Sequence, residues 1–278
     1  MKTINAQTIT KTVRDLCLKA NLELRKDVLS SLKQAYARET NKRAGNILRA
    51  ILENARIAKK EKLAICQDTG LPCVFVELGQ DVKIKGDLKA AINRGIAEGY
   101  KKGSFRNSII PDPLRRGKSA SVPGLIYVDL VKGNKLKLTV MPKGFGCENK
   151  SQLKMFNPTA GWDEIKKFIL DSVKIAGPDA CPPYVIGLGI GGTAEYACLM
   201  AKKALLRTAI PACRPALNAK LESDLLKKIN KLNIGPMGLG GKTTALAVNI
   251  ETYPTHIAGL PVAVNISCHA TRSATVVL

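Results

Sequence analysis

Apolar residues recur along the chain at two spacings, one typical of helices and one of strands. Within residues 8–62 they recur every three or four positions, in two runs separated near residues 39–42. The other stretches with helical spacing are 88–102, 162–176, 194–206 and 217–232. Short apolar runs typical of strands are 71–78, 125–131, 136–141, 184–188, 245–251, 261–266 and 274–278. This order predicts a mixed α/β fold in one domain, 1–278, with a helical N-terminal layer, 1–62, packed on an α/β body, 63–278.

Glycines mark several predicted connections. The pair Gly133-Asn134 predicts a hairpin between the strands 125–131 and 136–141. Residues 187–192 satisfy G-x-G-x-x-G between a strand and a helix, but no acid follows in residues 207–213 to hold a ribose. Residues 235–243 approach a P-loop, but Pro236 stands where a glycine is required. These clusters therefore favour anion-binding backbone over a nucleotide site.

Charge is the most unusual property of the composition. The 278 residues include 44 Lys+Arg and 22 Asp+Glu, a net charge of +22, yet 45% of residues are hydrophobic. An apolar fraction of this size excludes disorder as the main state of the chain. Aromatic residues make up 4%, which leaves few rings on which nucleic acid bases could stack. The lysines stand in short pairs on predicted helices, as on solvated helix faces.

The N-terminal residues lack the apolar core and cleavage site of a signal peptide, which predicts a cytoplasmic protein. The longest charge-free stretch, 252–271, contains Pro254, His256, Pro261, Asn265 and His269. It is too polar and too interrupted to span a bilayer. The eight cysteines of such a protein are expected to be reduced.

The cysteines divide by their surroundings. Cys17 and Cys198 lie on apolar helix stripes and are expected to be buried, and Cys73 and Cys213 are also expected to be structural. Three others, Cys66, Cys181 and Cys268, stand in predicted loops beside polar residues. Their separations match no local metal motif, so spacing alone leaves a shared metal site open.

Other candidate polar groups are few. The two histidines, His256 and His269, both lie after residue 255, and His269 adjoins Cys268. Arg106 and the arginines of 111–116 place guanidinium groups in a loop, where they could bind a carboxylate or remain solvated. The clustering of the two histidines favours a site in this part of the chain, and the residues alone leave both interpretations of the arginines open.

Several of these segments, taken in order, resemble one family. They are 66–70 (CQDTG), 180–183 (ACPP), 191–195 (GGTAE), 235–246 (GPMGLGGKTTAL), 254–257 (PTHI), 260–265 (LPVAVN) and 268–272 (CHATR). Together they are similar to the α-subunit of class I iron–sulfur fumarate hydratases and of L-tartrate dehydratases. The resemblance covers effectively the whole chain.

The resemblance implies a [4Fe–4S] cluster held by Cys66, Cys181 and Cys268. Such clusters normally take four thiolates, so three leave one iron with an open position. An open iron can serve as a Lewis acid toward a substrate hydroxyl or carboxylate.

The resemblance also implies roles for further residues. Asp68 is the candidate for proton transfer, although an Asx turn before Gly70 would explain an aspartate there as well. The candidate substrate-binding residues are Gln67, Arg106, Gly144, Gly146 and His256, with a backbone amide of the 144–146 turn contributing. His269 and Arg272 adjoin the third ligand and are expected to orient it.

One departure from the family concerns residues 143–149, which read KGFGCEN where the family often has KGGGSxN. Cys147 could therefore lie near the substrate or compete as a fourth ligand. Single-chain members of the family carry a second domain after this region. The resemblance thus implies a separate β-subunit, a hetero-oligomer, and no turnover by this chain alone.

The function that the resemblance implies is the reversible hydration of a dicarboxylate, fumarate to (S)-malate, which is the commoner activity of the family. The close alternative is dehydration of L-tartrate to oxaloacetate. A basic nucleic-acid-binding protein would explain the charge, but no helix-turn-helix or RNP-like pattern supports it, and neither nucleic acid nor membrane is an expected partner. An oxidoreductase that binds NAD rests on the 187–192 glycines alone.

Overall fold

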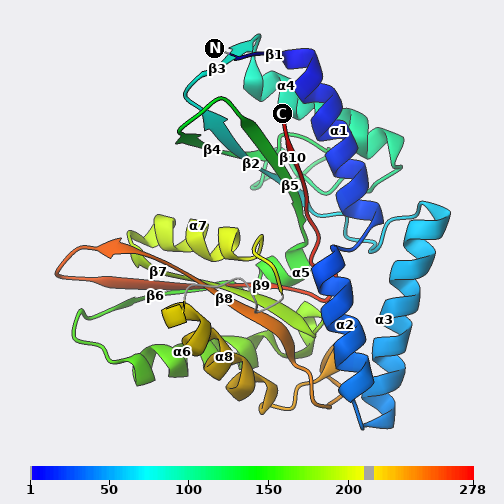
Figure 1. Ribbon diagram of the computed structural model, residues 1–278. Helices are drawn as coiled ribbons and strands as arrows, with labels where there is room; N and C mark the ends of the chain where they lie inside the picture. Colours follow the sequence, from blue (N-terminus) through cyan, green and yellow to red (C-terminus); the bar gives the residue numbers. More distant parts are fainter. Residues whose placement is uncertain (1, 210–215) are drawn as a thin grey trace. The chain divides into compact units, whose positions relative to one another are not determined.

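The computed structural model describes residues 2–209 and 216–278 (Figure 1). Mixed sheets and helices confirm the predicted α/β class. Among the described residues, no helix has both the length and the apolar character that crossing a bilayer requires.

The chain divides into two units, each assembled from separate segments. Unit 1 comprises Met1–Arg25, Ala55–Phe145 and Arg272–Leu278, and unit 2 comprises Lys26–Asn54 and Gly146–Thr271. The predicted single domain with a helical layer ending at residue 62 stays a prediction.

Three helices form the N-terminal part: α1 (Ala6–Leu22), α2 (Lys26–Arg38) and α3 (Lys42–Glu61). The predicted break near residues 39–42 is confirmed. Asn41 makes it, because its Oδ1 accepts hydrogen bonds from the backbone N–H groups of Arg43 and Ala44 and so caps α3. A second break, at residues 23–25, was not predicted.

Unit 1 is built on a sheet with the strand order β10–β5–β2–β4. The strands are β2 (Leu71–Gly79), β4 (Leu125–Val131), β5 (Leu136–Lys143) and β10 (Ala274–Val277), and β1 (Lys2–Asn5) pairs separately with β3 (Val82–Lys85). Helix α4 (Leu88–Lys102) has its predicted bounds, and Asp87 caps it by accepting a hydrogen bond from Ala90 N–H. Apolar side chains of α1, α4 and the sheet form one buried cluster.

The predicted hairpin between β4 and β5 is wrong. Strand β2 lies between them, parallel to β4 and antiparallel to β5. The end of β2 is held on both sides, because Gly79 N–H donates to Lys135 O and Gln80 N–H donates to Val131 O, each at 2.9 Å. Pairing with a strand distant in sequence therefore overrides the local turn signal.

Unit 2 contains a sheet with the order β6–β9–β7–β8. Its strands are β6 (Gln152–Phe156), β7 (Tyr184–Gly192), β8 (Ala245–Thr255) and β9 (Leu260–Ser267). Helix α7 (Ala194–Ala204) covers one face, while α6 (Trp162–Ala176) and α8 (Ala216–Asn230) lie on the other (Figure 1). Short helical turns are α5 (Phe145–Glu148), η1 (Gly177–Ala180) and η3 (Pro236–Gly238).

The glycines of 187–192 lie in strand β7, which extends through them, and not in a phosphate-binding loop. A Cβ atom built on Gly187 would lie 2.0 Å from Ala201 O, and one on Gly189 would lie 2.0 Å from Ala197 O. Because no side chain fits there, the backbone of α7 packs directly on β7. These two glycines are explained by helix–sheet packing.

The structural cysteines follow the predictions in part. Cys17 and Cys73 are buried as predicted, and burial raises the pKa of the Cys17 thiol to about 12. The prediction for Cys198 is wrong, since this residue is exposed on α7. The buried stripe of α7 runs through Ala197, Ala201 and Ala204 and leaves Cys198 outside it. Cys213 lies outside the described residues.

Candidate active site

Several predicted site residues of unit 1 meet at one edge of its sheet. Strand β5 is antiparallel to both β2 and β10, so the end of β5 lies beside the starts of the other two. Cys66, Gln67 and Asp68 precede β2, Gly144 follows β5, and Arg272 precedes β10. We call residues 66–70 the Asp68 loop.

Asp68 is fixed by its own carboxylate. Oδ1 accepts a hydrogen bond from Gly70 N–H at 2.9 Å. The Asx turn that the sequence offered as an explanation for Asp68 is therefore present. Oδ2 accepts a hydrogen bond from Phe145 N–H at 2.8 Å. An amide of the 144–146 turn therefore binds Asp68 in this structure. A Cβ atom on Gly144 would lie 3.2 Å from Oδ2, which favours glycine beside the carboxylate.

The Asp68 loop is also held from α4 and from the loop that contains Arg106. The Tyr100 hydroxyl lies 2.7 Å from Thr69 O and 3.0 Å from Gly70 O. Thr69 Oγ1 donates to Arg106 O at 2.9 Å. The main chain of Arg106 is thus adjacent to the Asp68 loop, and its side chain is exposed.

Replacing Tyr100 by Phe is expected to lower the free energy of unfolding by about 1–2 kcal/mol at pH 7, because buried carbonyl groups lose their donor. Burial raises the pKa of Tyr100, so only the unfolded chain ionises just above pH 10. The stability that this group contributes is complete below about pH 10 and declines as pH rises further. The Phe variant should lose less stability over that range.

Urea titrations at pH 7 and pH 10.5 measure both effects. Tyr36→Phe is the matched control, since Tyr36 is exposed on α2. Equal unfolding free energies for wild type and Tyr100→Phe at pH 7 would show that the hydroxyl does not support the loop.

Cys66 and Gln67 begin the Asp68 loop. Cys66 Sγ lies 3.3 Å from Gln67 Oε1, to which it can donate. The Cys66 residue is partly exposed and Gln67 is exposed. Both side chains are therefore accessible to a ligand at this edge of unit 1.

In unit 2 the structure brings Cys181 and Cys268 to one edge of the sheet. Cys181 precedes β7 and Cys268 follows β9, which is antiparallel to β7. His269 joins the two loops, because its backbone N–H donates to Cys181 O at 3.2 Å and its Nδ1 lies 3.1 Å from the same oxygen. Thr271 Oγ1 donates to Cys268 O at 2.8 Å. The two cysteines are partly exposed.

Gly146 lies near Asp179, in the turn before Cys181, and Cys147 is in the core of unit 2. A Cβ atom on Gly146 would lie 3.7 Å from Asp179 O, and Lys150 Nζ pairs with the Asp179 carboxylate at 2.7 Å. Asp179 belongs to the turn η1, and Cys181 is the residue that follows this turn. Cys147 is 4% exposed and belongs to the apolar core of unit 2.

His256 is not brought to the Cys181–Cys268 edge. It lies in the connection from β8 to β9, where Thr255 Oγ1 donates to Gly192 O at 3.2 Å, at the far end of β7. Nine residues form β7, so His256 and Cys181 are separated by roughly 25 Å at about 3.3 Å per residue. The His256 side chain is exposed, and its Nδ1 accepts a hydrogen bond from Ala258 N–H at 3.1 Å.

The chemistry of the three loop cysteines suits a soft metal. Within the described residues, no group of three or more His, Cys, Asp or Glu side chains stands ready to hold a metal ion. Cys181 and Cys268 belong to unit 2 and Cys66 to unit 1. All three are partly exposed, and thiolates are the ligands that iron–sulfur clusters take. The donor set therefore fits the predicted cofactor in type and accessibility.

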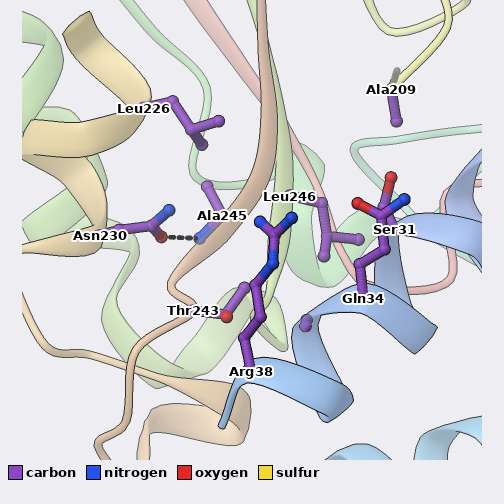
Figure 2. A pocket seen from close by; sticks show the side chains of 10 residues that line it. Ser31, Gln34, Arg38, Ala209, Leu226, Asn230, Thr243, Ala245 and Leu246 are labelled. Carbon is purple, nitrogen blue, oxygen red and sulfur yellow. Dashed lines mark hydrogen bonds between the residues drawn. The ribbon is translucent and has the colours of Figure 1, made fainter. Parts of the chain in front are cut away.

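Unit 2 also contains a pocket that other residues line. Figure 2 shows Arg38 reaching into it from α2, with Asn230 on the opposite wall. Asn230 Oδ1 accepts hydrogen bonds from the N–H groups of Thr244 and Ala245. No predicted site residue lines this pocket among the described residues.

Comparison with known families decides the assignment. A family model described as Fumarate hydratase (Fumerase) matches residues 10–277. The chain belongs to the fumarate hydratase family. The resemblance seen in the ordered motifs is thereby confirmed.

Relatives of this member of the fumarate hydratase family match it over about nine-tenths or more of their own length. A protein of Methanocaldococcus jannaschii, provisionally named L(+)-tartrate dehydratase subunit alpha, is 41% identical over 275 residues, 96% of each chain. A protein of Escherichia coli strain UTI89 with the name L(+)-tartrate dehydratase subunit alpha is 28% identical over 271 residues. That match covers 96% of this chain and 89% of the relative.

Sequence reasoning missed two supports of the Asp68 loop in this fumarate hydratase family member. Tyr100 lies within the predicted helix 88–102, and its hydroxyl contacts Thr69 O, 31 positions earlier in the chain. The guanidinium of Arg272 binds the carbonyl of Asp68, and the expected role of Arg272 in orienting Cys268 stays a prediction. A Tyr or an Arg that is buried needs a polar partner for its side chain. This requirement was the signal from which contacts of Tyr100 and Arg272 with polar groups could have been predicted.

Proposed function

We propose that this chain is the cluster-bearing subunit of a hydro-lyase that acts on a four-carbon dicarboxylate. The supporting observation is the distinct setting of three cysteines in a chain that belongs to the fumarate hydratase family. Cys66, Cys181 and Cys268 are partly exposed in loops, while Cys17, Cys73 and Cys147 are buried. A buried thiol is a poor metal ligand, because only the thiolate form binds the metal and burial disfavours a charged group.

In this proposal Cys66, Cys181 and Cys268 hold a [4Fe–4S] cluster. When bound, the cluster supplies an open iron site that polarises a substrate hydroxyl. Asp68 moves a proton at its carboxylate, which retains acceptor capacity beyond the two backbone hydrogen bonds. Arg106, exposed beside the Asp68 loop, binds a substrate carboxylate.

L-tartrate is the substrate that we favour, with oxaloacetate as product. The relatives with 41% and 28% identity bear the name of L(+)-tartrate dehydratase. This reverses the order drawn from the sequence, which placed fumarate first. Fumarate hydration is the second candidate, because the matching family model carries that description.

A separate β-subunit is part of the proposal. The relatives are named as alpha subunits, and they match this chain over about nine-tenths or more of their length. We therefore expect the purified chain alone to be inactive. Turnover of L-tartrate or fumarate by the single chain, free of any partner, would contradict this part.

Anaerobic reconstitution with iron and sulfide tests the cofactor. Wild type is expected to bind about four irons with a visible thiolate-to-iron absorption band. Cys66→Ala, Cys181→Ala and Cys268→Ala should each lose most of that iron. Cys198→Ala is the matched control, because Cys198 is exposed on α7 and outside the proposed ligand set.

Two outcomes would count against the proposed ligand set. One is a wild-type chain that binds no iron. The other is loss of the absorption band on Cys147→Ala together with full retention in the three proposed ligand variants.

The substrate is tested after the β-subunit has been added. A kcat/KM for L-tartrate at least tenfold above that for fumarate would support our substrate order, and the reverse would favour fumarate.

A further inference from the structure

Arg272 is a buried cation at the edge of the sheet in unit 1. Its residue is 4% exposed, and its Nη2 donates a hydrogen bond to the carbonyl oxygen of Asp68. Its Nε and Nη1 are buried and have no hydrogen-bond partner among the described residues. Among the described residues, Nη2 is therefore the one guanidinium nitrogen of Arg272 that makes a hydrogen bond.

Packing alone does not explain an arginine at this position. A buried N–H group without a partner costs stability, and a buried charge costs more. An apolar side chain would fill the same space without that cost. The contact that distinguishes arginine here is the one with the Asp68 carbonyl.

The contact completes the restraint of Asp68. The carboxylate is held by the N–H groups of Gly70 and Phe145, which fixes the side chain. Arg272 holds the main-chain carbonyl of the same residue. Arg272 precedes β10 and Phe145 follows β5, so the backbone and the side chain of Asp68 are restrained by residues at the ends of different strands.

We propose that Arg272 is a positioning residue for Asp68, acting through the backbone carbonyl of the Asp68 loop. Its catalytic consequence rests on the function proposed above, in which Asp68 moves a proton. Its structural consequence does not, since the restraint acts in the chain without any ligand.

The structural consequence is tested by amide hydrogen exchange on the full chain. In Arg272→Met, the amides of Gly70 and Phe145 are expected to exchange at least about tenfold faster, because the loop they restrain gains freedom. Arg272→Lys retains one donor but lacks the planar guanidinium, so its increase should be smaller. Lys137→Gln is the matched control, since it removes one positive charge from the same sheet in a half-exposed pair with Glu77.

The catalytic consequence is tested with the reconstituted complex of both subunits. We expect kcat to fall about 100-fold in Arg272→Met and about tenfold in Arg272→Lys, with KM changed less than about threefold, because misplacement of a reacting group affects the chemical step. Iron content should stay at the wild-type level. If Arg272→Met does not fold, Arg272→Lys decides by the same readouts.

The outcomes separate the two proposals. Wild-type amide exchange together with wild-type kcat in a folded Arg272 variant would overturn the positioning role. A wild-type complex that holds no iron would overturn the proposed function, and the exchange experiment would still decide the role of Arg272 in the Asp68 loop.

Discussion

Replacing Asp68 by Asn is expected to lower kcat by about 10²–10⁴-fold, the range for loss of a positioned proton-transfer group. The carboxylate receives Gly70 N–H on Oδ1 and Phe145 N–H on Oδ2. An amide has one acceptor oxygen, so its NH₂ would face one of these donors. We therefore also expect a loss of about 1–3 kcal/mol in unfolding free energy. Steady-state kinetics of the reconstituted complex and urea titration of the chain measure the two effects.

Asp112→Asn separates catalysis from turn formation. Asp112 Oδ1 accepts hydrogen bonds from Leu114 N–H at 3.0 Å and Arg115 N–H at 3.1 Å, so it forms a comparable turn in the same unit. Its kcat should equal that of wild type. If Asp68→Asn and Asp112→Asn kept equal, near-wild-type kcat, Asp68 would be a turn residue only.

Gly189→Ala is expected to destabilise unit 2 by at least about 3 kcal/mol, as overpacking against rigid backbone does. The added Cβ would lie 2.0 Å from Ala197 O and 2.8 Å from Ala201 N, both in the backbone of α7. A helix backbone cannot rotate away as a side chain can, so α7 would have to move off β7. The free energy of unfolding from denaturant titration measures the loss.

Gly45→Ala is the control for this substitution, because a Cβ atom on Gly45 meets nothing within 4 Å. It lies within α3 and should stabilise the chain by about 1 kcal/mol through helix propensity. Wild-type stability of Gly189→Ala, combined with a change in NAD binding, would revive the nucleotide interpretation of residues 187–192.

Elements with a self-contained pattern were predicted well. Helices α4 and α6 have their predicted bounds, because their apolar stripes are regular and glycine marks both C-terminal ends. The prediction failed where a distant segment decides the outcome. The turn at Gly133 looks like a hairpin locally, and β2, some fifty residues earlier, separates its two strands. The glycines of β7 resemble a phosphate loop, and contact with α7 explains them instead.

The candidate site shows the same division. The Asx turn at Asp68 is a local feature, and the sequence indicated it. The bonds from Tyr100, Phe145 and Arg272 join positions far apart, which no local pattern specifies. His256 illustrates the converse, because it is near Cys268 in sequence and lies at the opposite end of β7 from Cys181.

The contact between Arg272 and Asp68 also orders events during synthesis. These residues are 204 positions apart, and the segment Gly146–Thr271 of unit 2 lies between them. At about 5–20 residues per second, the ribosome needs roughly 10–40 s to reach Arg272 after Asp68 has been made. Throughout that time the Asp68 carbonyl lacks its buried donor, and the sheet of unit 1 lacks β10. The Asp68 loop therefore gains its hydrogen bond from Arg272 late, after most of unit 2 has already left the ribosome.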